Sequence, residues 1–152
     1  MSPKKTNQRA IATNRKARYE YEVEDSYEAG LVLQGTEVKS LRQGNAIIRE
    51  GYVVITNGEA WLHQVYIPEY THGNRENHNP TRKRKLLLNH REILKIQKKT
   101  SQQGNTAFTL ELYFKGPRVK ILLGVGRGKK LYDKRQSEKE KSARRELRNQ
   151  ED

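Results

Sequence analysis

The chain has 152 residues and a formal net charge of +13, which predicts a polyanionic partner, either a nucleic acid or an anionic membrane surface. Only 33% of its residues are hydrophobic, so we expect a body of roughly 100 residues with polar extensions. The absence of cysteine excludes disulfides and thiolate metal sites. No apolar run approaches the ~20 residues of a membrane span, and none forms the core of an N-terminal signal peptide. These features fit a cytoplasmic protein.

The N-terminal part begins with a basic stretch that is almost free of large apolar side chains, so we expect a flexible arm over residues 1–17. Residues 19–23 alternate between apolar and acidic side chains, which predicts a half-buried strand. Residues 26–33 fit either a short helix or a strand. Within them, Glu28 is an acidic residue in a basic protein. It is either a surface charge or a carboxylate that accepts hydrogen bonds from a base edge.

An Asn-Gly pair at residues 57–58 separates two apolar runs, residues 47–55 and 60–67. Both residues tolerate a positive φ, so this pattern predicts a β-hairpin. The apolar side chains that we expect to face the core are Val53, Ile55, Trp61, Val65 and Ile67. The short segment at residues 37–42 before this hairpin ends at a Gln-Gly turn.

The polar loop at residues 70–80 contains His72 and His78, but no carboxylate or cysteine pattern completes a metal site around them. No serine lies in a nucleophile-elbow context, and no Ser/His/Asp order is legible. We therefore expect no catalytic residues, no metal and no other cofactor. The enzymatic alternative is a two-metal nuclease that uses Glu28 or Asp133, but it requires a cluster of carboxylates that the sequence does not contain.

Four consecutive cations at residues 82–85, including Arg84 and Lys85, directly precede three leucines that include Leu87. Buried cations are costly without partners, and leucines need cover. We therefore expect the cations to surround an apolar surface that the leucines help to form. Such a surface favours RNA binding, and the alternative is a solvated run of charge.

A helix is predicted to begin at Asn89, because Glu92 follows at the spacing of a capping box. Residues 108–114 and 119–125 are predicted to form two further strands. The whole pattern gives about six strands, one clear helix and no βαβ repeat. The predicted fold is therefore mainly β: a six-stranded antiparallel barrel of the oligonucleotide-binding (OB) type over residues 18–127, with flanking helices.

The stretch at residues 124–135 joins an apolar strand to a charged tail. It is not a phosphate loop, because three residues rather than four separate Gly124 from Gly128, and Lys129 is followed by another lysine. We interpret it as a flexible exit in which cations surround an aromatic ring, which suits contact with RNA: Arg127, Lys129, Lys130, Tyr132, Lys134 and Arg135. A solubilising tail is the alternative. Residues 128–152 carry few apolar anchors, so we expect this tail to be disordered when free.

Five motifs, taken in order along the chain, resemble the SsrA-binding protein (small protein B) family. They are residues 14–18 (NRKAR), 27–30 (YEAG), 35–42 (GTEVKSLR), 84–89 (RKLLLN) and 128–135 (GKKLYDKR). The resemblance implies an OB-type barrel and a non-catalytic protein. It further implies binding to the tRNA-like domain of transfer-messenger RNA (SsrA) and delivery of that RNA to stalled 70S ribosomes for trans-translation.

The resemblance also implies roles for individual residues. Glu28, Leu87 and Asn89 fall on the RNA-contacting face of the family, and Lys120, Lys129 and Lys130 match its phosphate-binding cations. From the basic stretches we add Arg84, Lys85 and Arg127. The remaining matched residues, which would begin the ribosome-binding tail, are Tyr132, Asp133, Lys134 and Arg135.

In this family the tail lies in the empty decoding centre and message channel, so we expect residues 128–152 to become helical on the ribosome and to contact 16S rRNA. The elongation factor that carries alanylated transfer-messenger RNA would be an indirect partner. We expect a monomer and no membrane contact. A membrane-surface protein, or a purely structural ribosome-associated protein, is the rival that RNA- and liposome-binding assays would distinguish.

Overall fold

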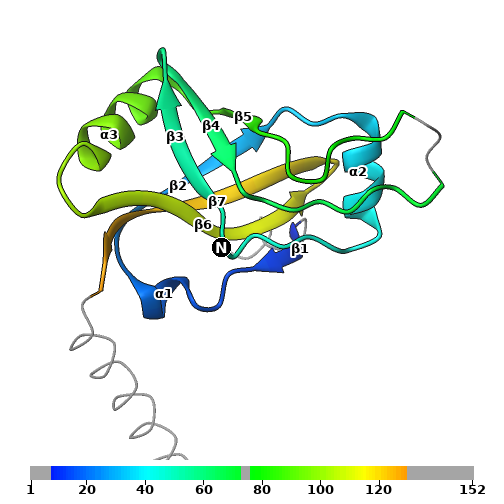
Figure 1. Ribbon diagram of the computed structural model, residues 1–152, viewed down its shortest axis with the longest axis horizontal. Coiled ribbons are helices and arrows are strands. Elements are labelled where there is room, and N and C mark those ends of the chain that lie inside the picture. The colour runs from blue at the N-terminus through cyan, green and yellow to red at the C-terminus, as the bar shows by residue number, and fades with distance from the viewer. Residues whose placement is uncertain (1–7, 73–75, 130–152) are drawn as a thin grey trace, which may run out of the picture.

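The computed structural model describes residues 8–72 and 76–129 (Figure 1). These residues form a mainly β fold with seven strands and three helices. The strands are β1 (Gln8–Thr13), β2 (Tyr21–Leu31), β3 (Tyr52–Thr56), β4 (Glu59–His63), β5 (Arg84–Leu87), β6 (Asn105–Lys115) and β7 (Arg118–Gly128). The helices are α1 (Ala17–Glu20), α2 (Gly35–Arg42) and α3 (His90–Thr100). The predicted number of six strands is therefore corrected to seven.

All the strands join one antiparallel sheet in the order β1-β6-β3-β4-β5-β2-β7, with an additional pairing between β6 and β7. One edge of β6 pairs with β7, while its other edge pairs with β1 and, at Phe108, with Tyr52 of β3. The pairings therefore return to β6 after passing through six strands. Helices α3 and α2 lie at opposite ends of the molecule (Figure 1).

Two local predictions are confirmed by the backbone. The β3–β4 hairpin turns at Asn57 and Gly58, whose φ angles are +52° and +76°. Helix α3 begins with a capping box, in which the Asn89 side chain accepts a hydrogen bond from the Glu92 backbone N–H at 2.9 Å, and Glu92 accepts one from the Asn89 N–H at 3.1 Å. The amphipathic α3 then buries Ile93 and Ile96 against the sheet.

The N-terminal segment differs from its prediction. Residues 8–13 are not a free arm, because β1 pairs with β6, and Asn14 then donates a side-chain hydrogen bond to the Thr109 carbonyl at 2.9 Å. The half-buried Ile11 and Ala12 pack against the core. Backbone hydrogen bonds to the edge of β6 thus stabilise this segment, although it lacks the large apolar side chains whose absence suggested disorder. The expected strand at residues 19–23 starts only at Tyr21, after α1.

Two further segments are clarified. The ambiguous residues 26–33 fall mostly in β2, and the short segment at residues 37–42 belongs to α2, where Glu37 accepts a hydrogen bond from the Gln34 backbone N–H at 2.8 Å and so holds the first turn. Of the core residues expected in the hairpin, Val53, Val65 and Ile67 are buried, and Ile55 is half-buried against the core. Trp61 is only half-buried, because Leu62 takes the inward position on β4.

No helix among the residues that the structure describes is long and apolar enough to cross a membrane.

Candidate nucleic-acid interface

A row of directly opposed residues crosses four strands on one side of the sheet. Leu87 of β5 pairs with Gly30 of β2, Gly30 pairs with Lys120 of β7, and Lys120 pairs with Tyr113 of β6. Opposed residues in an antiparallel sheet project from the same face. We call these four residues and Glu28, two positions before Gly30 on β2, the cross-strand face. Leu87, Lys120 and Glu28 reach its surface, whereas Tyr113 and Gly30 are buried beneath them.

The centre of the cross-strand face depends on a glycine. A Cβ atom at position 30 would lie 3.3 Å from Cβ of Leu87 and 3.7 Å from Nζ of Lys120, so Gly30 lets these two side chains approach each other. Leu87 nevertheless remains 54% exposed, although Leu86 beside it is buried in the core. The face therefore presents an apolar side chain directly next to a cation, which suits contact with both a base and a phosphate.

The Glu28 carboxylate is held by two partners on β6. The Tyr113 hydroxyl donates a hydrogen bond to Oε2 of Glu28, and Nζ of Lys115 lies 3.2 Å from Oε1. The hydrogen bond from Tyr113, followed by that from Lys115, lowers the pKa of Glu28 despite partial burial. Glu28 is therefore a carboxylate at neutral pH, and its two oxygens position Tyr113 and Lys115 on the face.

Free cations are available beside this carboxylate. Neither Lys120 nor Arg118 forms an ion pair with any described residue. Arg118 pairs with Lys115 across the β6–β7 turn and is exposed. Three cations, Lys115, Arg118 and Lys120, thus accompany two carboxylates, Glu28 and Glu111, the second of which acts on Tyr113. The local charge therefore still favours a polyanion.

The run of cations at residues 82–85 does not form a uniform ring. Strand β5 alternates, so Arg84 and Leu86 face the core, while Lys85 and Leu87 face outward. Arg84 has 0% exposure and donates to Glu37 at 2.5 Å. The prediction that Arg84 binds RNA is therefore wrong for this fold, because its guanidinium is buried and forms an ion pair with Glu37.

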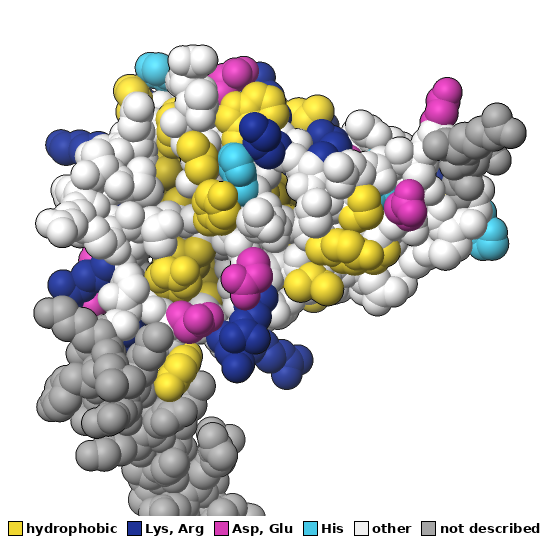
Figure 2. Space-filling view, viewed as in Figure 1, with side chains coloured by type: hydrophobic (Ala, Val, Ile, Leu, Met, Phe, Trp, Pro, Cys, Tyr) yellow, Lys and Arg dark blue, Asp and Glu magenta, His cyan; other side chains and the backbone are white. Residues whose placement is uncertain are grey.

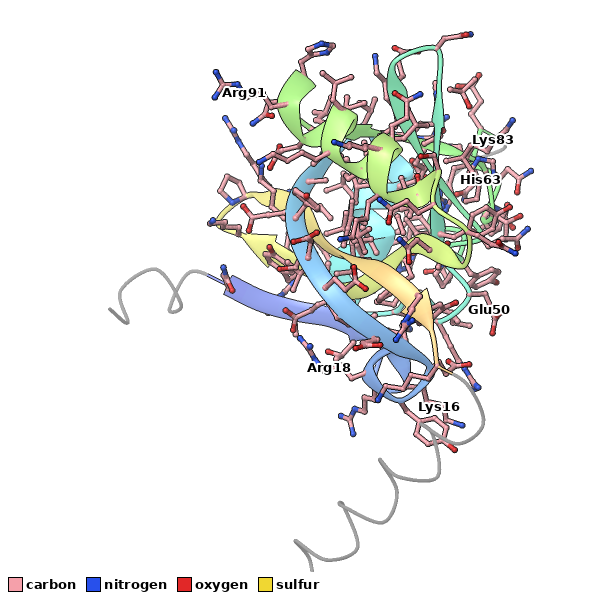
Figure 3. All side chains as sticks on the ribbon, turned by 90° about the vertical axis from the view of Figure 1, so that its left-hand side faces the viewer. Lys16, Arg18, Glu50, His63, Lys83 and Arg91 are labelled. Atoms are coloured by element: carbon pink, nitrogen blue, oxygen red, sulfur yellow. The ribbon has the colours of Figure 1, made fainter. Side chains whose placement is uncertain are left out.

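The neighbours of Arg84 have mixed roles. Arg82 also donates to Glu37, at 2.6 Å, and Lys85 pairs with Glu59 at 2.6 Å on the surface. Lys83 is exposed and forms no ion pair among the described residues. Figure 3 shows Lys83 pointing outward, as do Lys16, Arg18 and Arg91 on other parts of the body. Surface cations are thus distributed around the protein rather than collected at residues 82–85.

The other predicted contact residues lie at the ends of elements. Asn89 is exposed and caps α3, next to Leu87 in sequence. Arg127 is exposed near the end of β7 and contacts Glu22 at 3.1 Å. The Lys129 backbone N–H donates to the Glu20 carbonyl at 2.8 Å. Lys130 and the predicted tail residues Tyr132, Asp133, Lys134 and Arg135 lie outside the described residues.

Sequence reasoning missed Tyr113, Lys115 and Arg118. A signal was present, because residues on either side of a two-residue turn pair in a fixed register. Counting outward from the turn at residues 116–117 pairs Lys115 with Arg118 and Tyr113 with Lys120, as the structure has them. The alternation of residues 108–114 predicted the strand but did not show which face carries the site.

The described residues contain no group of three or more histidines, cysteines or acidic residues that could hold a metal ion. An open sheet face with an exposed leucine and several cations is typical of nucleic-acid-binding proteins. The chain belongs to the SmpB family: the family model described as SmpB protein matches residues 11–151.

Individual relatives agree with the family match. The SsrA-binding protein of Leifsonia xyli subsp. xyli is 53% identical over 143 residues, which cover 94% of this chain and 90% of that relative. The SsrA-binding protein of Mesorhizobium japonicum is 54% identical over 141 residues, with 92% and 89% covered. A solved structure described as "tmRNA-SmpB: a journey to the center of the bacterial ribosome" has 43% identity and a TM-score of 0.67, and the match covers 79% of this chain and 85% of that one.

Proposed function

We propose that this protein binds the tRNA-like domain of transfer-messenger RNA and delivers it to stalled ribosomes for trans-translation. It is a non-catalytic RNA-binding protein whose partners are transfer-messenger RNA and the ribosome. Membership of the SmpB family and similarity to a chain from a tmRNA-SmpB ribosome structure support this function. The observation that carries it is the cross-strand face, where exposed Leu87 lies beside Lys120, which has no ion-pair partner among the described residues, and a carboxylate at Glu28.

We further propose that the six strands in the ring of pairings form an OB-type barrel. The pairing of β6 with both β7 and β3 supports this assignment, since it joins the two ends of the strand order. In such a barrel, exposed edges are few and an outer face is available to an oligonucleotide. Strand β1 is then an addition to the free edge of β6.

The division of labour between body and tail is also a proposal. In it, the barrel at residues 18–127 binds transfer-messenger RNA, and residues 128–152 become helical in the decoding centre and message channel against 16S rRNA. Tyr132, Asp133, Lys134 and Arg135 would make the first contacts there. Lys129 and Lys130, at the start of this segment, would instead bind phosphates together with Lys120. The elongation factor that carries the alanylated RNA is an indirect partner, and the cytoplasm is the compartment where these partners meet.

A truncation after Leu131 tests this division. The shortened protein is expected to keep most of its affinity for transfer-messenger RNA in a filter-binding assay, with bulk tRNA and anionic liposomes as controls. Alanine transfer and peptide tagging on stalled ribosomes should collapse. A truncated protein that tags at the parental rate would contradict the role of the tail, and a parent that prefers liposomes to the RNA would contradict the function itself.

A further inference from the structure

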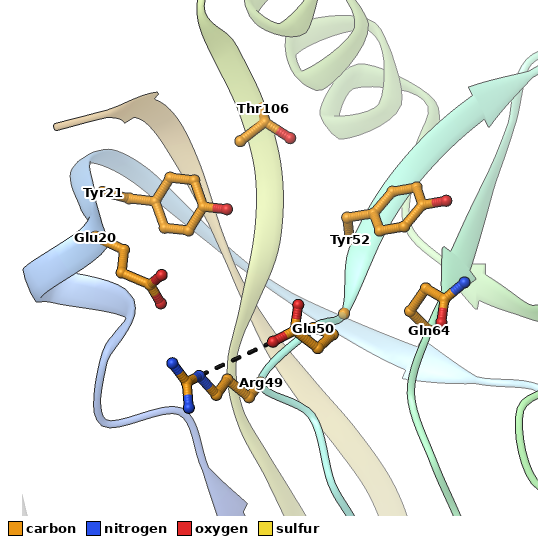
Figure 4. A pocket seen from close by; sticks show the side chains of 8 residues that line it. Glu20, Tyr21, Arg49, Glu50, Tyr52, Gln64 and Thr106 are labelled. Carbon is orange, nitrogen blue, oxygen red and sulfur yellow. Dashed lines mark ion pairs between the residues drawn. The ribbon is translucent and has the colours of Figure 1, made fainter. Parts of the chain in front are cut away.

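A concave site lies away from the cross-strand face, where α1, β2, β3 and β6 meet the residue that follows β4. It is an open hollow of about 430 Å³, and none of its lining residues belongs to the cross-strand face. The side chains that the argument uses are Glu20, Tyr21, Glu50, Tyr52, Gln64 and Thr106. Figure 4 shows Tyr21 and Tyr52 on opposite sides of the hollow, with Thr106 between them.

Each of the two tyrosine rings stacks on a neighbouring ring. The Tyr21 ring stacks on Phe108 with a centroid distance of 4.1 Å and an interplanar angle of 12°. The Tyr52 ring stacks on His63 at 5.0 Å and 20°. Tyr52 is still 38% exposed, so it offers a supported ring to a planar partner. Proteins that recognise unpaired RNA stack bases on aromatic side chains in this way.

The polar groups of the hollow select the partner further. Burial raises the pKa of the Tyr21 hydroxyl, and the charges of Glu20 and Glu50 raise it more, so both carboxylates act on the space around this hydroxyl. Arg49 lies 3.9 Å from Glu50 and offsets only part of this negative charge. Carboxylates repel a phosphate, but they accept hydrogen bonds from the N–H groups of a base.

The backbone at Gln64 adds an independent sign of a built site. Its φ angle is +62°, in the left-handed region that residues other than Gly, Asn and Asp rarely adopt. The strained residue immediately follows β4 and lines the hollow. Strain of this kind persists where the surrounding structure enforces it, often at binding sites. An amide at this position can both donate to and accept from a base edge.

We propose that this hollow binds one unpaired RNA base that presents N–H donors on its Watson–Crick edge, with guanine as the best fit. The base stacks on Tyr52, and its N–H groups donate to the carboxylate of Glu50. On the face seen in Figure 2, basic side chains form separate groups among acidic and hydrophobic ones, so the surface is not restricted to phosphate contacts.

The location suits this role. The hydrogen bond from the Lys129 N–H to the Glu20 carbonyl places the end of the described chain beside a residue that lines the hollow. The inference rests on the proposed function, because that function brings RNA to the protein. The base could come from transfer-messenger RNA or from ribosomal RNA, and the two arms of the experiment distinguish these sources.

The experiment measures the reactivity of unpaired guanines toward kethoxal, which attacks the same N–H edge. One arm uses the full-length protein with transfer-messenger RNA alone, and the other uses the same pair on stalled 70S ribosomes. The parent, Tyr52→Ala and Glu50→Gln proteins are compared with Tyr66→Ala. Tyr66 is a matched control, since its 39% exposure equals that of Tyr52 within one percentage point and it lies outside the hollow.

We expect the parent and Tyr66→Ala to protect one guanine from kethoxal. With Tyr52→Ala, the occupancy of the hollow by this guanine should fall roughly tenfold, and its protection should fall with it. Glu50→Gln, an exposed change that keeps the fold, should also reduce protection. Protection in the first arm assigns the base to transfer-messenger RNA, and protection only in the second assigns it to ribosomal RNA. Equal protection by all four proteins in both arms overturns the inference, as does stronger protection by Glu50→Gln. A parent that does not bind transfer-messenger RNA would instead refute the proposed function.

Discussion

The Nε atom of Arg84 lies 2.5 Å from Oε2 of Glu37, and both side chains are completely buried. The same guanidinium donates to the carbonyl oxygens of Val65 at 2.7 Å and Pro80 at 2.9 Å. Arg82 completes the group by donating to Glu37 at 2.6 Å. One carboxylate on α2 therefore links α2 to β5 and to the segment before β5.

Arg84→Met should cost about 3–5 kcal/mol of unfolding free energy, because it leaves a buried carboxylate short of a partner. Urea unfolding followed by circular dichroism measures the loss. Lys85→Met is the matched control, since its ion pair with Glu59 is on the surface and should be worth less than about 1 kcal/mol. Equal small losses for the two variants would refute a structural role for Arg84.

The same carboxylate predicts a loss of stability in acid. Burial pushes the pKa of Glu37 upward, but hydrogen bonds from Arg82, the Gln34 backbone and Arg84 outweigh it and lower the net pKa below 4.5. A lowered folded-state pKa contributes stability that is fully present above the unfolded value and is lost as the pH falls through the folded value. The urea concentration at the unfolding midpoint of the parent should therefore fall once the pH is lowered below about 4.5.

Glu37→Gln separates this carboxylate from the others in the protein. The variant should be less stable at neutral pH and should show a shallower fall in urea midpoint between neutral and acidic solution than the parent. Parallel curves for the two proteins would mean that other carboxylates govern the acid transition.

The sequence predicted the elements whose signals are local. Asn57-Gly58 has a backbone preference of its own, and Asn89 and Glu92 satisfy each other within one helical turn. It failed where a distant partner decides the outcome. Strand β1 exists because the edge of β6 supplies its hydrogen bonds, and no property of residues 8–13 reveals that edge.

The candidate site was predictable only in part, because its local motifs can be read from the sequence but its distant contacts cannot. The family resemblance identified Glu28, Leu87 and Lys120, and the strand register brings them onto one face. The run at residues 82–85 was interpreted as a single charged surface, although a strand turns alternate residues inward. Arg84 became a buried ion pair because α2 places Glu37 opposite it, which requires knowledge of the fold.

Lys120 should contribute an electrostatic contact to RNA binding. Lys120→Met is expected to weaken binding of transfer-messenger RNA and to reduce the slope of log affinity against log salt by about 0.7–0.9. A salt titration by filter binding measures this slope. Lys98→Met, at the exposed end of α3, is the control and should change the slope less. An equal change for both variants would indicate a general field rather than a contact at Lys120.

Asn89 combines a cap with a predicted RNA contact, and two substitutions can separate these roles. Serine caps a helix about as well as asparagine, whereas alanine does not. Asn89→Ser should therefore keep the unfolding free energy within a few tenths of a kcal/mol, and Asn89→Ala should lose about 1 kcal/mol. Both variants lack the amide, so both should lose about 1–3 kcal/mol of specific binding to transfer-messenger RNA if that amide reads a base edge. Denaturation and filter binding at fixed salt measure the two quantities. An Asn89→Ser protein that binds like the parent would restrict Asn89 to its cap and move base recognition to the neighbouring Leu87, Lys120 and Glu28.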